Sequence, residues 1–355
     1  MKAIERLDPS WNRWTRAAKD VQGSDVPLLI RGEHRNEGPP TPRGWLTAIN
    51  ASDRNALETV LPESRRKSSG RLWLAEQIVH PANPLTSRVW ANRIWHHLFG
   101  RGIVATPNNF GLLGAKPTHR ELLDFLAQRL VDQNWSTKKL IREIVFSRAY
   151  QRTSQIPQST KESDPENKFL SYHSRRRLNA EQLRDAMLAV SGSIDLKMHG
   201  PSVDVFVPPY ATANKPSNIP VSGPLDGGNR RSIYIKVRRS FFDPFLRTFD
   251  FPNPGKSIGK RIITVAPTQS LAMLNSPLVH ELSGDWARVI PPNTQTVDDR
   301  CVAEMWNQAL GRSPTSQELA IIHSLFADLE SLAPIEKKKQ VAHLLFNHPE
   351  FMWID

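Results

Sequence analysis

Apolar residues recur at helical spacing over much of the chain, and most of these segments carry start and stop signals. Asn83 can cap a helix with Pro84 in its first turn, and Gly100 suits a left-handed end. Other apolar runs follow similar capping residues: Thr118 with Glu121, Ser136, Asn179 with Gln182, and Thr315 with Glu318. Further helices are expected at "RLWLAEQIV" and "EKKKQVAHLLFN". The pattern predicts a mainly α-helical protein.

Only short segments have the period of a β-strand. In "RSIYIKVRR", residues 231–239, apolar residues alternate with polar ones, as in a half-buried strand. A strand needs a partner, for which residues 203–207 and 261–265 are the candidates. Residues 26–30 form another apolar, strand-like run. We therefore expect a small β element of a few short strands within a helical fold.

Proline and glycine divide the chain into four expected segments. Residues 1–70 are irregular and predict an N-terminal arm, and residues 71–199 predict a helical lobe. Residues 200–230, rich in Pro, Gly, Ser and Asn, predict a long central loop or lid. Residues 231–355 then predict a second lobe, with a short strand followed by helices. The expected fold is a multi-helix globular domain with a long Pro/Gly-rich central loop.

Composition limits the classes of function. The 355 residues carry a formal net charge of +12, in scattered basic runs. Such a charge attracts nucleic acid, anionic glycans or acidic protein surfaces, although a solvated basic surface without a dedicated partner is an equal reading. No run approaches the length of a membrane-spanning helix, and no secretory signal is readable at the start. The chain is either cytoplasmic or separated from its export signal.

The single cysteine, Cys301, excludes an intramolecular disulfide and every CxxC or CxxCH motif. The sequence therefore predicts no c-type haem in this chain and no cysteine-based zinc site. The adjacent His96 and His97 point about 100° apart on a helix, so they do not have the spacing of two metal ligands. No HExxH, GxSxG, GxxxxGK[ST] or GxGxxG motif occurs, so the usual signals of zinc proteases, hydrolases and nucleotide-binding folds are missing.

The stretch "NPLTSRVWANRIWHHLFGRGIVATPNNFG" gives the first group of candidate site residues. On a helical wheel, one arc is apolar and predicts core: Trp90, Ile94, Trp95, Leu98 and Phe99. Arg88, Asn92 and His96 follow one another beside this arc, and Arg93 stands one turn from His97. These polar residues either tie down the following loop or form an anion or sugar site with the two arginines as forks for carboxylate or sulfate. Both readings stay open.

A second group of candidates lies in "RRRLNAEQLRDAML". Arg177 precedes the expected helix, and Glu181 and Asp185 stand one turn apart with Arg184 between them. Two carboxylates at this spacing suit acid–base chemistry or cation binding, but such a set more often forms an ion-pair network between helices. Again the residues alone leave both readings open.

Several long motifs resemble a known family: "NPLTSRVWANRIWHHLFGRGIVATPNNFG", "PTHRELLDFLA", "RRRLNAEQLRDAMLAVSG", "RRSIYI" and "VAPTQSLAMLNSP". In this order they are similar to the carboxy-terminal domain of unknown function found at the end of large planctomycete cytochrome-c-like proteins. The resemblance runs over nearly the whole chain. It implies an extracytoplasmic or periplasmic, redox-associated setting, often linked with polysaccharide breakdown. It also implies a c-type haem on a separate module, and haem-bearing and sister domains as partners, but no catalytic residue.

Three functions compete. The first is a helical scaffold or binding domain that docks a haem-bearing module or binds anionic polysaccharide through Arg88, Asn92, Arg93 and His96. The second is a polysaccharide-acting enzyme with acid–base residues in a cleft between lobes, drawn from Glu181, Asp185, His96 and His119. The third is nucleic-acid binding, which the charge and ten tryptophans suggest but no recognised module supports. We expect the first.

Overall fold

A computed structural model describes most of the chain: residues 19–46, 60–156, 158–208, 222–238, 241–290 and 297–354. The chain divides between Ser174 and Arg175 into two compact units, so that residues 19–174 and 175–354 are treated separately below. This boundary differs from the expected one after residue 199. Residues 1–18, in the expected arm, and 209–221, in the expected central loop, lie outside the described residues.

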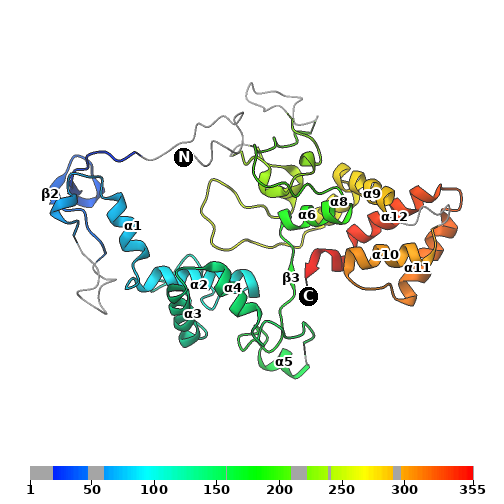
Figure 1. Cartoon of the computed structure of the whole chain (residues 1–355), viewed down its shortest axis with the longest axis horizontal. Coiled ribbons are helices and arrows are strands. Elements are labelled where there is room, and N and C mark those ends of the chain that lie inside the picture. The colour runs from blue at the N-terminus through cyan, green and yellow to red at the C-terminus, as the bar shows by residue number, and fades with distance from the viewer. Residues whose placement is uncertain are drawn as a thin grey trace. The chain divides into compact units, whose positions relative to one another are not determined.

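The unit of residues 19–174 contains one small sheet and a helical part (Figure 1). Strand β1, Val26–Leu29, pairs antiparallel with β2, Glu37–Thr41, which confirms the short strand expected near residue 26. The helices are α1 Arg71–Val79, α2 Pro84–Phe99, α3 Arg120–Asp132, α4 Thr137–Val145 and α5 Gln158–Ser163. Helices α2, α3 and α4 pack on one another. Their facing side chains form the core of this unit, with Ala91, Leu130 and Leu140 fully buried.

The capping residues explain where these helices begin and end. Asn83 accepts a hydrogen bond from the Leu85 amide at 3.0 Å, and Gly100 ends α2 with a φ of 78°, as the sequence predicted. Ser136 caps α4, also as predicted. The predicted Thr118 cap of α3 is wrong, because Thr118 donates its amide to the Ile103 carbonyl at 3.0 Å and its hydroxyl points to the same oxygen.

The unit of residues 175–354 is also mainly helical. Its helices are α6 Ala180–Val190, α7 Pro244–Thr248, α8 Pro267–Asn275, α9 Pro277–Val289, α10 Asp299–Leu310, α11 Ser316–Asp328 and α12 Pro334–Asn347. Strand β3, Arg176–Arg177, pairs antiparallel with β4, Trp353–Ile354. Helices α9 and α12 pack closely (Figure 1), and Trp286, Trp306 and Phe346 fill the core around them. The mainly α-helical fold with a small β element is therefore confirmed.

The strand expected at residues 231–239 is wrong. Ser232–Tyr234 form a 3-10 turn, because the Ser232 amide and hydroxyl both donate to the Asp185 carboxylate at 2.7 Å. Beyond the turn, Val203 makes one parallel bridge to Ile235: its amide donates to the Tyr234 carbonyl and its carbonyl accepts from Lys236. The expected partner segment at 203–207 is thus in place, but a single bridge does not make a strand.

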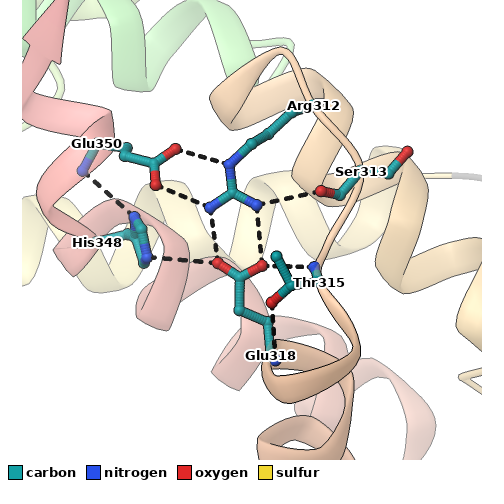
Figure 2. Close-up of polar contacts among 6 residues, drawn as sticks. All are labelled: Arg312, Ser313, Thr315, Glu318, His348 and Glu350. Atoms are coloured by element: carbon teal, nitrogen blue, oxygen red, sulfur yellow. Dashed lines mark hydrogen bonds and ion pairs between the residues drawn. The ribbon is translucent and has the colours of Figure 1, made fainter. Parts of the chain in front are cut away.

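A cluster of charged residues closes the carboxy-terminal part of this unit (Figure 2). The Arg312 guanidinium donates to both oxygens of Glu318 at 2.9 and 2.7 Å, and to both oxygens of Glu350 at 2.8 Å. Thr315 and Glu318 complete the predicted capping box of α11. The cluster joins the loop before α11 to the turn after α12, so it stabilises the unit.

Candidate functional site

The predicted polar line on α2 is used mainly to hold the fold together. Arg88 donates to Asp124 of α3 at 2.6 Å and to the Pro84 carbonyl at 2.8 Å. Asn92 is fully buried: its amide nitrogen donates to the Val104 carbonyl at 3.0 Å, and its oxygen accepts from the Val104 amide at 2.8 Å. His96 is half-buried, beside His97. Arg88 and Asn92 therefore fix α3 and the loop after α2.

The predicted group on α6 forms a network of hydrogen bonds. Arg184, only 1% exposed, donates to the Ser232 hydroxyl at 3.0 Å and to backbone carbonyls of residues 226 and 230. Burial lowers the pKa of Arg184. Glu181 is held by Arg261 through both carboxylate oxygens, one at 2.7 Å. Asp185 accepts from Ser232, as described above, so α6 is tied to the segments that follow it.

Arg177 has the same structural character. It is buried, donates to Gln269 at 2.8 Å and to the Thr264 carbonyl, and lies over the ring of Phe249 at 5.6 Å. Burial lowers the pKa of its guanidinium. Arg184 and Asp185 thus share contacts through Ser232, whereas Arg177 and Glu181 bond other partners, and all four are already bonded. This arrangement favours the ion-pair network that the sequence offered as one of two readings.

A cavity large enough for an organic ligand lies elsewhere, on the unit of residues 19–174. It is an open groove of about 500 Å³, lined by Val79, Leu85, Thr86, Val89, Trp90, Trp135 and Thr137. Trp90 was expected in the core, but it is 42% exposed and its indole N–H donates to the Thr137 hydroxyl at 3.0 Å. Helix α1, helix α2 and the start of α4 therefore meet here, with two indoles between them.

Trp135 reaches this groove from a constrained turn. It follows α3 with a φ of 59°, in the left-handed region that is unusual for a bulky residue, and its amide donates to the Leu130 carbonyl at 2.8 Å. Asn134 before it has a φ of 52°. Part of the Trp135 ring packs on the core, which offsets the backbone strain. The ring is therefore held in a fixed position at the edge of the groove.

Arg93 adds a positive charge to the same side of α2. It lies four residues after Val89 and three after Trp90, so all three share one helix face. The side chain is half-buried and makes no hydrogen bond or ion pair within the described part of the chain. Lys138 and Lys139 are exposed in the first turn of α4, directly after the groove residue Thr137. Two tryptophan rings that line the groove thus lie close in sequence to basic side chains that make no ion pair among the described residues.

Sequence reasoning named Arg93 but missed the groove. The two tryptophans are far apart along the chain, and Trp135 comes from a turn whose conformation no helical pattern predicts. The available signal was Trp90, which lies at the edge of the apolar arc on α2. Its neighbours Arg88 and Asn92 attracted attention because they are polar, yet they proved to be bonded within the fold.

Comparison with known protein families adds one assignment. The model of PSD1, a protein of unknown function (DUF1553), matches residues 70–326. The chain belongs to this family. No curated protein and no solved structure matches it. The PSD1 match includes every predicted site residue, the groove and α6, and it gives the family no stated activity.

Two further observations concern cofactors and membranes in this PSD1 chain. Its only cysteine, Cys301, is fully buried in α10, and burial raises the pKa of its thiol. Among the described residues, no three His, Cys, Asp or Glu side chains gather to hold a metal ion. Within the same residues, no helix is long and apolar enough to cross a bilayer.

Proposed function

We propose that this PSD1 chain is a binding domain for acidic polysaccharide, and that the ligand lies in the groove between Trp90 and Trp135. One observation carries the proposal: two indoles line one ligand-sized groove, and Arg93 lies on the same helix face as the lining residues Val89 and Trp90, without an ion pair among the described residues. The volume of about 500 Å³ lies within the range of small-molecule sites, roughly 300 to 1,000 Å³. It suits a few linked sugar rings.

The chemistry of the groove matches an acidic sugar chain. One face of a sugar ring carries mainly C–H groups and packs well on an indole, which is a large flat apolar surface. The guanidinium of Arg93 can donate two parallel hydrogen bonds to a uronate carboxylate or a sulfate ester on that sugar. Lys138 and Lys139 extend the positive charge, and the net charge of +12 attracts a polyanion from a distance.

The setting that we propose comes from the resemblance. In it the chain works outside the cytoplasm, next to a haem-bearing module and a sister domain carried elsewhere. The chain itself supplies no electron carrier. Its role there is to hold polysaccharide, while redox chemistry belongs to the other modules.

Titration of the full chain with defined oligosaccharides tests the proposal. Calorimetry would compare oligouronates and sulfated oligosaccharides with neutral oligosaccharides of the same length, at low and high salt. We expect acidic chains to bind more tightly, with an affinity that falls as salt rises. Trp90→Ala and Arg93→Gln should each weaken this binding about tenfold, which is the loss of one stacked ring or one charged contact.

Matched controls separate the groove from general charge and aromatic effects. Trp353→Ala removes a similarly exposed tryptophan in the other unit, and Arg300→Gln removes an exposed arginine there, so both should leave binding unchanged. Equal binding of neutral and acidic chains would refute the role of Arg93. Tighter binding of single-stranded oligonucleotides, lost in the same two groove variants, would assign the groove to nucleic acid instead.

Docking of a haem-bearing or sister domain is the second candidate function. The observation in its favour is an apolar segment in the unit of residues 175–354, where Ile262, Ile263 and Val265 are 76%, 54% and 84% exposed. Such grouped exposed apolar residues are typical of interaction surfaces. Analytical ultracentrifugation of the chain with a c-type haem module from a longer family member tests it. Docking is supported if a complex forms with the wild type and is lost in the double variant Ile262→Ser with Val265→Ser. If the wild type forms no complex, that module is excluded as the partner.

A further inference from the structure

The loop between α2 and α3 projects two leucines from an ordered turn. Asn109 accepts the Gly111 amide on its side-chain oxygen at 3.0 Å, and the Gly114 amide donates to the Gly111 carbonyl at 2.9 Å. A side chain at Gly114 would collide with the Asn109 carbonyl, since its Cβ would lie 2.1 Å from that oxygen. The Thr106 hydroxyl donates to the Asn109 carbonyl at 2.8 Å and accepts from the Ala115 amide at 2.9 Å, so it links the two sides of the loop. These hydrogen bonds define the conformation of the turn that carries the tip residues.

Leu112 and Leu113 form that tip, and both are almost completely exposed, at 106% and 93%. Two neighbouring leucines that are exposed to water lose the stabilisation that burial of their side chains would give. Nothing in the local fold requires them, because the turn is fixed by glycine and asparagine. Exposed apolar residues at the tip of an ordered turn are typical of a site that inserts into a membrane or contacts another protein.

Positive charge surrounds the base of this loop. Arg101 and His119, at its two ends, line a cavity of about 40 Å³ together with Lys168 and Glu166. Glu166 pairs with Arg101 at 2.7 Å and with Lys168 at 3.2 Å, so these three groups keep one net positive charge. Lys116 and Arg120 are exposed near the end of the loop. The loop that carries the leucine tip is thus flanked in sequence by the basic residues Arg101, Lys116 and Arg120, with Lys168 nearby.

We propose that this end of the unit of residues 19–174 binds an anionic lipid surface. Leu112 and Leu113 enter the boundary between headgroups and acyl chains, while Lys116, Arg120 and the Arg101/Lys168 pair contact the phosphates. Apolar burial combined with attraction to anionic headgroups is the general basis of reversible binding at a bilayer surface. The site is separate from the tryptophan groove and does not depend on polysaccharide binding.

The shape of the tip favours lipid over a protein partner. A convex pair of leucines needs a matching pocket in a protein, whereas a fluid bilayer closes around any small apolar protrusion. Basic residues on both sides of the tip in the sequence suit the phosphates of a headgroup layer. Only the tip leaves water, so the paired backbone of the loop base stays in the polar region.

Co-sedimentation of the full chain with vesicles tests the proposal. We expect binding to vesicles of phosphatidylcholine with phosphatidylglycerol, weak binding to phosphatidylcholine alone, and loss of binding at high salt. Leu112→Ser with Leu113→Ser should lower the affinity at least about tenfold. The control is Leu196→Ser with Met198→Ser, an apolar pair in the other unit of which each residue is 66% exposed, and this variant should bind as the wild type does.

A second measurement reports the position of the tip. Leu113→Cys can be labelled selectively with an environment-sensitive dye, because Cys301 is buried. A blue shift of its emission on anionic vesicles is expected, and no shift would overturn the proposal. The lipid proposal is also overturned if the variant Leu112→Ser with Leu113→Ser binds vesicles like the wild type. If the wild type self-associates without lipid and this variant does not, the tip binds a second copy of the chain and the lipid proposal is wrong.

Discussion

At the scale of single residues, Asn92 and Arg93 stand side by side on α2 and make opposite predictions. Asn92 is buried and satisfies both backbone groups of Val104. Asn92→Ala should therefore lower the free energy of unfolding by about 2–4 kcal/mol, because it leaves a buried N–H and a buried C=O without partners. Urea denaturation followed by circular dichroism measures the loss.

Arg93→Ala is the natural comparison for that experiment. Its side chain is half-buried and unpaired among the described residues, so we expect a stability change below about 1 kcal/mol. Polysaccharide binding should fall in this variant. If Arg93→Ala destabilised the fold as much as Asn92→Ala, both residues would belong to the loop support, and the groove would lack its cation.

The same residues show how far sequence reasoning reaches. Asn83, Ser136 and Gly100 were predictable because capping depends on neighbours within a few residues. The partners of Arg88 and Asn92 were not, because Asp124 and Val104 are brought close only by the fold of α3 and its loop. Trp135 could not be placed, since its left-handed turn follows from packing against the core.

At the scale of elements, the Arg312 cluster is the clearest source of acid sensitivity (Figure 2). Hydrogen bonds from Arg312 hold the pKa of Glu318 far below its usual range. A lowered carboxylate pKa adds stability above the ordinary glutamate pKa, and this stability is lost as the pH falls below about 4.3. Arg312→Lys should cost about 1–2 kcal/mol at neutral pH, since a lysine ammonium cannot make the two-point contacts that the guanidinium makes with both carboxylates.

The loss should shrink as the medium becomes acidic. Below the ordinary glutamate pKa the unfolded chain takes up a proton that the paired Glu318 of the folded state does not, so the stability gained from the pairing shrinks and the urea midpoints of the two proteins should converge. Arg288→Lys is the control, because Arg288 is an exposed partner of Asp285 and such surface pairs contribute little. An equal cost at acidic and neutral pH would mean that Arg312 acts through packing and not through its charge.

Helices α9 and α12 carry a second pH-dependent contact. The imidazoles of His280 and His343 stack at 4.5 Å, and burial together with His280 lowers the pKa of His343, with Lys339 adding to the effect. The folded state keeps His343 neutral, partly against its contact with the Met273 carbonyl. The unfolded chain takes up a proton below about pH 6.5, so stability should fall as the pH drops through that value.

Denaturation at pH 7, 6 and 5 would measure this dependence, whose slope for one proton is at most about 1.4 kcal/mol per pH unit. His343→Gln removes the titrating group and should flatten the profile over this range. His34→Gln, at an exposed position of the other unit, should leave the profile as it is. A profile unchanged by His343→Gln would show that other groups cause the acid loss.

At the scale of the whole molecule, the sequence predicted the helical class because helical periodicity is a local property that recurs along the chain. It placed the domain boundary after residue 199, at the proline-rich segment, whereas the compact units divide between Ser174 and Arg175. The difference arises from α6, whose side chains Leu183, Met187 and Leu188 pack into the core of the later residues. Which core a helix joins depends on tertiary contacts that periodicity does not contain.

Two separate cores predict two separate unfolding events. Leu130 is fully buried in the core of residues 19–174, and Leu282 is fully buried in the core of residues 175–354. Leu130→Ala and Leu282→Ala should each cost about 2–5 kcal/mol, because each leaves a cavity in a packed core. Scanning calorimetry of the full chain should show two transitions, of which each variant lowers only one. A single transition lowered by both variants would mean that the units unfold as one cooperative body.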